Sequence, residues 1–178
     1  MGFAKFIFNK VLGWKIQGNF DPKLSKCVII AAPHTSWHDF YIGVFTRRIQ
    51  KMDINWVGKK ELFTWPFGYY FRWMGGASLD RTSGQNKVEA IAELFNKKKE
   101  FRLTLAPEGT RKKVDTWKTG FYYIALKADV PIVPVAFDYG TKTVIINKPF
   151  SPSGNIEKDL PILRSFYEGV VGKKPEYT

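Results

Sequence analysis

Residues 26–33 read KCVIIAAP, an apolar run that predicts a strand buried on both faces. The polar stretch HTSWHD follows at residues 34–39, and a helix is predicted over residues 37–50. This order of strand, loop and helix recurs along the chain. Further strands are predicted near residues 15–20, 53–58, 78–81, 101–107, 130–139 and 142–150, and further helices near 60–77, 86–99, 119–129 and 156–172. The alternation predicts an α/β fold, a single domain with a largely parallel central sheet flanked by helices.

Proline positions and chain length refine this prediction. We expect Pro66 to interrupt the helical segment at 60–77 and Pro161 to break the terminal helix at 156–172. A chain of 178 residues is long enough to bury one substantial core without disulfides. The single cysteine, Cys27, lies inside the apolar strand and is expected to be a buried, inert thiol.

Charge and aromatic content point to an anionic partner. The formal net charge is +12, and 16% of the residues are aromatic. Both nucleic acid and anionic lipid would attract such a molecule. The chain carries no zinc-finger spacing, no RNP-like aromatic motif and no basic region leading into heptads, so we expect no nucleic-acid partner.

The first 18 residues predict an amphipathic helix. On a helical projection Phe3, Ile7, Val11 and Trp14 fall together. Such a helix is typical of a membrane interface, and it is equally typical of a helix packed on the core of its own domain. No apolar run in the sequence approaches the length of a membrane-spanning helix.

His34 and Asp39 form a candidate base and its orienting carboxylate. If Ser36 caps the helix, Asp39 lies in the first turn and accepts a hydrogen bond from the imidazole. The same residues also match a capping box, in which Asp39 would only bind backbone N–H groups. No seryl or cysteinyl nucleophile is evident, so a substrate hydroxyl or water would attack.

His38 offers a competing interpretation, because it lies four residues after His34 and the two could share a metal ion on one helix. The glutamate of an HExxH motif is missing, and the sequence holds no third histidine. Pro33 also indicates that His34 precedes the helix. We therefore expect no metal site.

Three cationic residues follow other predicted strands. Arg111 belongs to PEGTR at residues 107–111, Arg81 to SLDR, and Lys59 to GKKEL. Because loops at the carboxyl ends of parallel strands gather ligands, these side chains are candidate phosphate ligands beside His34 and Asp39.

Four blocks in order resemble the lysophosphatidate and glycerol-3-phosphate acyltransferases, the PlsC-like family. The blocks are HTSWHD, GKKELFTWPFG followed by GGASLDR, APEGTR, and VPIVPV. The chain departs from the family pattern in two places, with Pro33 where asparagine is usual and Ala106 where phenylalanine is common. The resemblance covers about residues 32–135.

The resemblance implies roles for individual residues. His34 would be the general base and Asp39 its orienter. Substrate-binding residues would be Lys59, Arg81, Glu108, Gly109, Thr110 and Arg111, with the two arginines on the acceptor phosphate. Pro131 and Pro134 would form a wall of the acyl pocket.

It also implies the reaction and its location. A fatty acyl group would pass from acyl-CoA or acyl carrier protein, used as a co-substrate with no other cofactor, to a lysophospholipid such as 1-acylglycerol-3-phosphate. Residues 1–18 would form a membrane-interface helix and residues 19–178 the acyltransferase domain. The protein would then bind an anionic membrane surface peripherally, on the cytoplasmic face.

Three alternatives stay open. The acceptor could be another lyso-lipid, such as an amino-acid lipid. The chain could instead be a non-catalytic basic module that binds anionic lipid or nucleic acid. A third alternative is a hydrolase that uses the same His–Asp base on water.

Overall fold

A computed structural model of the chain describes residues 2–79 and 87–178, and for residues 59, 60, 62, 78 and 79 it describes the backbone alone. Seven strands form one sheet in the order β1-β7-β6-β2-β5-β3-β4. The strands are β1 (Lys15–Gln17), β2 (Lys26–Ala32), β3 (Asn55–Lys59), β4 (Gly76–Leu79), β5 (Phe101–Leu105), β6 (Ile132–Asp138) and β7 (Thr143–Ile146). Every neighbouring pair is parallel except β6 and β7. This confirms the predicted α/β fold.

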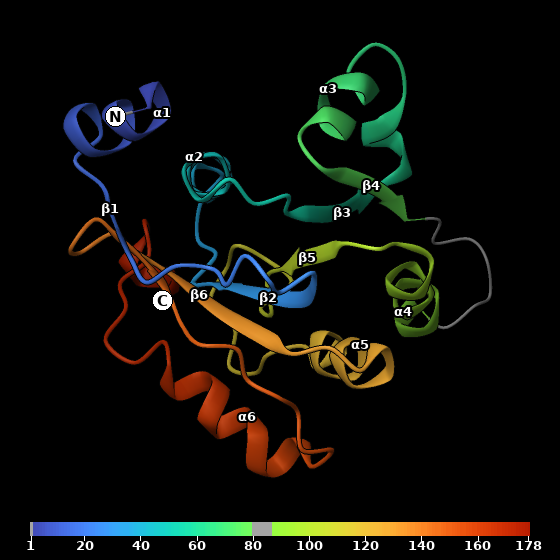
Figure 1. The fold of residues 1–178 in the computed structure, drawn as a ribbon. Coiled ribbons are helices and arrows are strands. Elements are labelled where there is room, and N and C mark those ends of the chain that lie inside the picture. The colour runs from blue at the N-terminus through green and yellow to red at the C-terminus, as the bar shows by residue number, and fades with distance from the viewer. Residues whose placement is uncertain (1, 80–86) are drawn as a thin grey trace.

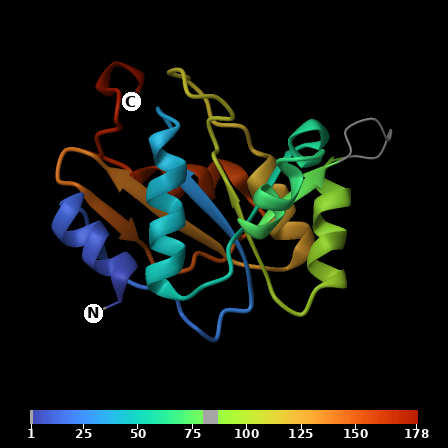
Figure 2. The ribbon, with the colours of Figure 1, turned by 90° about the horizontal axis from the view of Figure 1, so that it is seen from above.

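Helices cover both faces of the sheet (Figure 1). They are α1 (Phe3–Phe6), η1 (Ile7–Val11), α2 (His38–Gln50), η2 (Lys60–Phe63), α3 (Gly68–Trp73), α4 (Lys87–Lys97), α5 (Gly120–Ala128), α6 (Ile156–Ser165) and η3 (Pro175–Tyr177). Helices α1, α2 and α3 lie on one side of the sheet, and α4, α5 and α6 lie on the other (Figures 1 and 2). A sheet whose strands are apolar on both faces needs helices on both sides to bury those faces, and this explains the three layers.

The central strand β2 shows how the core divides. Its side chains alternate between the faces, so Val28 and Ile30 pack with α4, α5 and α6, whereas Cys27 and Ile29 pack on the α2 side. Cys27 is fully buried, and burial raises the pKa of its thiol to about 12. The expected inert thiol is confirmed as a buried, protonated group.

The N-terminal segment is shorter as a helix than the 18 residues expected. The helical part ends at Val11, and Lys15–Gln17 joins the sheet as β1, inside the strand predicted at residues 15–20. The expected apolar stripe also divides, because Trp14 is buried in the core while Phe3 and Val11 are exposed. Phe8, outside that stripe, is the residue that anchors this segment in the core.

Pro161 does not break the terminal helix, contrary to expectation. Helix α6 continues through Pro161 to Ser165, and it ends well before residue 172. Leu163, two residues after the proline, is fully buried in the core beneath α5. This burial offsets the one backbone hydrogen bond that a proline removes.

Candidate active site

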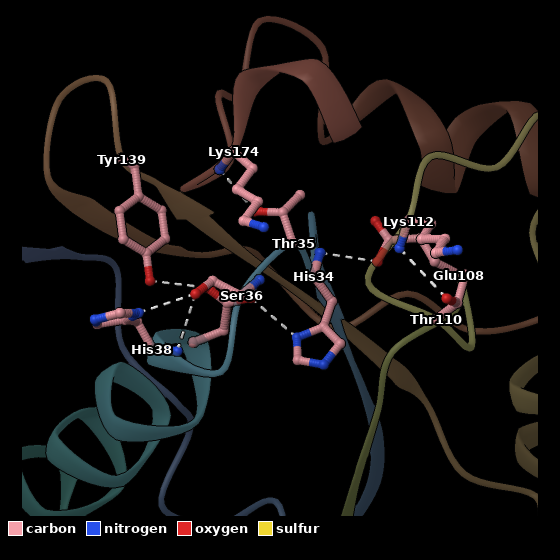
Figure 3. Close-up of polar contacts among 10 residues, drawn as sticks. His34, Thr35, Ser36, His38, Glu108, Thr110, Lys112, Tyr139 and Lys174 are labelled. Atoms are coloured by element: carbon pink, nitrogen blue, oxygen red, sulfur yellow. Dashed lines mark hydrogen bonds and ion pairs between the residues drawn. The ribbon is translucent and has the colours of Figure 1, made fainter.

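Three neighbouring strands carry the polar residues of the candidate site at one edge of the sheet. Strand β2 pairs in parallel with both β5 and β6, so the carboxyl ends of all three strands lie together. His34 follows β2, Glu108 follows β5, and Tyr139 follows β6 directly. Figure 3 shows Tyr139 pointing toward the start of α2 and Glu108 pointing toward the backbone nitrogen of His34 from the other side.

His34 and Asp39 make the predicted contact. The Nδ1 atom of His34 lies 3.0 Å from Oδ2 of Asp39, and this bond fixes the tautomer that carries its proton on Nδ1. The His34 side chain is 27% exposed and that of Asp39 only 1%. Within the described residues, the Nε2 atom of His34 has no hydrogen-bond partner. The imidazole can therefore accept a proton on the side away from Asp39.

Asp39 is held by three donors. Besides His34, the backbone N–H of Ser36 donates to Oδ2 at 2.9 Å, and the hydroxyl of Tyr139 donates to Oδ1 at 2.7 Å. The bond from Ser36 is the half of a capping box in which the side chain reaches back toward the helix start. The two interpretations of Asp39 are compatible, since one carboxylate accepts both the backbone N–H of Ser36 and the imidazole of His34, although the residue that flanks α2 is Trp37 rather than the expected Ser36.

Tyr139 is a site residue that the sequence analysis missed. Burial raises the pKa of its phenol, and the hydrogen bond to Asp39 raises it further, so the hydroxyl stays protonated and donates. The ring of Trp14 packs edge-on against Tyr139, with the ring centroids 4.8 Å apart. The only sequence signal was its place at the end of a predicted strand, and that strand's position beside β2 cannot be read from local pattern.

Glu108 fixes the loop that carries His34. Its Oε2 atom accepts the backbone N–H of His34 at 2.8 Å. Burial raises the pKa of Glu108, while the bond from His34 lowers it in part. Gly109 follows with a φ of +65°, and a Cβ there would approach the Lys118 side chain to 2.8 Å. Glu108 therefore holds the backbone of His34 in place, and Gly109 allows the turn.

Of the other predicted substrate-binding residues, those that the structure describes make no hydrogen bond or ion pair with His34 or Asp39. Thr110 and Arg111 lie in the exposed turn after Glu108, where the Thr110 hydroxyl accepts the N–H of Lys112. Within the described residues, Arg111 has no ion-pair partner. Lys59 is the last residue of β3, and Arg81 lies outside the described residues.

An apolar cavity of about 230 Å³ lies between α2 and the sheet, and His34 and Asp39 are among the residues that line it. Phe40, Gly43 and Val44 of α2 form one wall. The opposite wall is built by β2, β5 and β6, and Trp56 of β3 also contributes. Val135 and Phe137 line the cavity on β6, rather than the expected Pro131 and Pro134. Side chains alternate along a strand, so Pro134 faces the other side of the sheet from its lining neighbour Val135.

The two histidines do not share a site. His38 is exposed, its Nδ1 atom lies 2.9 Å from the Ser36 hydroxyl, and its ring packs at a tilt against that of Trp37. In the described part of the chain, no group of three or more histidine, cysteine, aspartate or glutamate residues could hold a metal ion. Among residues 2–79 and 87–178, no carboxylate is hydrogen-bonded to His38 to orient it as the base of a Ser–His pair.

Comparison with known families decides the relationship. The family model described as Acyltransferase matches residues 15–138, which include His34, Asp39 and Glu108 and end one residue before Tyr139. The chain belongs to the acyltransferase family. The matched region begins at β1, so the N-terminal helical residues, Phe3 to Val11, lie outside it.

Individual members of the family show the same relationship. The chain is 34% identical over 98 residues to the 1-acyl-sn-glycerol-3-phosphate acyltransferase of Escherichia coli, covering 52% of this chain and 40% of that one. It is 33% identical over 138 residues to the corresponding enzyme of Streptococcus pneumoniae, covering 71% and 50%. The chain thus spans about half or less of the length of these relatives.

A solved structure shares the fold of the present chain. The crystal structure of the 1-acyl-sn-glycerophosphate acyltransferase PlsC from Thermotoga maritima superposes with a TM-score of 0.64 at 24% identity. The match covers 92% of this chain and 73% of that chain.

Proposed function

We propose that this chain transfers a fatty acyl group from a thioester, acyl-CoA or acyl carrier protein, to the free hydroxyl of 1-acylglycerol-3-phosphate. The observation that carries the proposal is the position of His34 and Asp39 in the wall of an apolar cavity. An oriented base beside an apolar cavity fits a reaction in which a hydroxyl attacks a fatty thioester. The names of the family members quoted above support the same acceptor.

The mechanism uses His34 as base and then as acid. Its Nε2 atom takes the proton of the acceptor hydroxyl while that oxygen attacks the thioester carbonyl carbon. Asp39 accepts the Nδ1–H bond and stabilises the imidazolium that forms. The tetrahedral intermediate then breaks its carbon–sulfur bond, and His34 returns the proton to the departing thiolate. A thioester is already activated, so no covalent enzyme intermediate is required.

Acceptor binding is assigned to the turn after Glu108. Arg111 is exposed there without an ion-pair partner in the described chain, and a guanidinium can bind phosphate through two hydrogen bonds. Arg81 and Lys59 remain proposed phosphate ligands on the strength of the family motif. The acyl chain would occupy the cavity between α2 and the sheet.

The enzyme is proposed to work peripherally at the cytoplasmic face of an anionic membrane. Its net charge of +12 favours such a surface, and its acceptor and product are lipids. None of the helices in the described part of the chain is both long and apolar enough to span a bilayer.

The test is a product analysis with purified protein, acyl-CoA and 1-acylglycerol-3-phosphate. We expect phosphatidate to form in equal amount to the free thiol released. Release of free fatty acid with thiol, and no phosphatidate, would show a hydrolase instead. A panel that includes an amino-acid lyso-lipid checks the acceptor, because faster acylation of that lipid would replace the proposed one.

A further inference from the structure

The segment between β3 and β4 presents an unusual cluster of exposed aromatic side chains. Its members, here called the docking face, are Trp65, Phe67, Tyr69, Tyr70 and Trp73, each between 49% and 84% exposed. An isolated exposed aromatic is ordinary, but five within nine residues form a patch that marks an interaction site. Three residues of the docking face belong to α3, and the other two lie in the turn before it.

The opposite side of the same segment is packed. Phe63 and Met74 are buried, and the rings of Phe63 and Phe71 contact Trp56 of β3. Trp56 and Met74, like His34, line the apolar cavity. The segment is therefore anchored by one aromatic side beside the cavity, while its other aromatic side faces outward.

Basic residues border the docking face. Arg47, Arg48 and Lys51, at the carboxyl end of α2, line a hollow together with Trp73. Arg72 of α3 is exposed as well. The sequence from residue 40 to 79 contains only two acidic residues, Asp53 and Glu61, and Asp53 is paired with Arg47. Surfaces that rest in the headgroup layer of an anionic bilayer typically combine tryptophan and tyrosine with arginine and lysine.

The position of the docking face agrees with that of the N-terminal helix. Helices α1 and α3 lie on the same side of the sheet, with α2 between them, as the view from above shows (Figure 2). Phe3, Phe6 and Val11 are exposed on the N-terminal helical segment. Two exposed apolar surfaces on one side of the molecule can reach one plane, whereas α4, α5 and α6 cover the side away from it (Figure 1).

We propose that the docking face inserts into the interface of an anionic bilayer and holds the cavity next to the lipid. The aromatic rings enter the acyl boundary, and Arg48, Lys51 and Arg72 contact lipid phosphates. The inference rests on the proposed function, because it explains how a membrane-borne lipid reaches the cavity. It assigns the contact to residues 65–73 in addition to the N-terminal helix.

Vesicle partition tests this proposal. The probe is unilamellar vesicles of phosphatidylcholine with phosphatidylglycerol, and the readout is the fraction of protein that floats with them. The double variant Trp65→Ser/Trp73→Ser should weaken partition at least about tenfold, because each indole carries a large apolar area. The matched control Tyr123→Ser/Ile162→Ser removes exposed apolar side chains of α5 and α6 from the far side, and it should partition like the unmodified protein.

Folding and function are separated by further readouts. Trp65→Ser alone changes a side chain that is 84% exposed, so it should weaken partition even if the double variant proves unstable. On short-chain, water-soluble substrates the double variant should keep its activity, while on vesicle-borne lysophosphatidate it should lose activity. If the unmodified protein partitions, the tryptophan variants partition less, and none of them acylates lysophosphatidate, the proposed function fails and the docking face stands.

Two results would overturn the docking face. One is unchanged partition of both tryptophan variants. The other concerns the oligomeric state in sedimentation. If the unmodified protein is a dimer, and the tryptophan variants are monomers that still bind vesicles, the patch is a contact between two copies of the chain.

Discussion

Asp39 accepts bonds from His34, Ser36 and Tyr139, and the last of these is the one that a conservative substitution can remove. Tyr139→Phe deletes only the hydroxyl that donates to Oδ1. We expect kcat to fall about tenfold, the effect of losing one hydrogen bond to a charged group. KM for the acceptor should stay unchanged, because Tyr139 acts through Asp39 and not on substrate. Steady-state kinetics give the two constants separately.

The control for this substitution is Tyr123→Phe, which removes a hydroxyl from an exposed tyrosine on α5. It should leave both constants unchanged. Asp39→Asn should reduce kcat far more than Tyr139→Phe, since it removes the charge that stabilises the imidazolium. A Tyr139→Phe enzyme with normal kcat would show that the bond has no positioning role.

Arg111 is the residue-scale test of acceptor recognition. Arg111→Ala should raise KM for 1-acylglycerol-3-phosphate about tenfold while changing kcat little, because a phosphate contact made equally before and during the reaction affects binding alone. Lys158→Ala removes a positive charge from an exposed position of α6 and serves as the control. Equal effects of the two substitutions on KM would mean that only overall charge matters.

At this scale the sequence predicted local geometry well and distant geometry poorly. The contact between His34 and Asp39 could be predicted because both residues lie in one short loop and helix start. The bonds from Tyr139 to Asp39 and from Glu108 to the His34 backbone join residues far apart in the chain. They depend on the order of strands in the sheet, which residue spacing alone does not determine.

At the scale of elements, helix α2 controls the width of the cavity through Gly43. A Cβ added at Gly43 would lie 3.8 Å from the Phe137 ring, at ordinary contact distance, and Gly43 lines the cavity. Gly43→Leu should therefore fill part of the cavity and shift preference toward shorter acyl chains. The measurement is kcat/KM across a series of acyl-CoA chain lengths.

Gly43→Ala is the matched control for this element. It adds one methyl group without a clash and should raise helix stability by about 0.5–1 kcal/mol. Its chain-length profile should stay close to that of the unmodified enzyme. If Gly43→Leu accepts long chains unchanged, the acyl group does not enter this cavity.

Element prediction succeeded where apolar periodicity was strong. The strands at β2, β5 and β6 and the helices at α2, α4 and α5 all form near their expected positions. The predictions were wrong where burial in the core overrides local signals. Pro161 lies inside α6 instead of breaking it, and Trp14 lies outside the helical segment and packs in the core. Local pattern gives no account of such long-range packing.

At the scale of the whole molecule, buried Asp159 ties α6 to α5. It accepts hydrogen bonds from the Tyr122 hydroxyl at 2.8 Å and from the backbone and hydroxyl of Ser153. Burial alone would raise the pKa of Asp159, but these bonds lower it below the ordinary value. A carboxyl whose pKa is lowered by folding stabilises the fold above its unfolded pKa, and that contribution is lost as pH falls through the folded value.

Asp159→Asn should therefore lower the free energy of unfolding at neutral pH by about 1–3 kcal/mol. The difference from the unmodified protein should shrink as pH falls below about 4, where the aspartate of the unfolded chain is protonated. Denaturant unfolding at a series of pH values measures this. Glu157→Gln, at an exposed site on α6, is the control, and a difference that grows at acid pH would contradict the account.

The whole fold brings one histidine to the cavity and leaves the other at the surface, and this contrast gives the most direct test of the proposed mechanism. The measurement is kcat/KM for phosphatidate formation by His34→Ala and by His38→Ala, with the free thiol counted. The mechanism predicts a loss of at least about 100-fold for His34→Ala and a near-normal value for His38→Ala. Near-full activity of His34→Ala, or an equal loss in both variants, would contradict it.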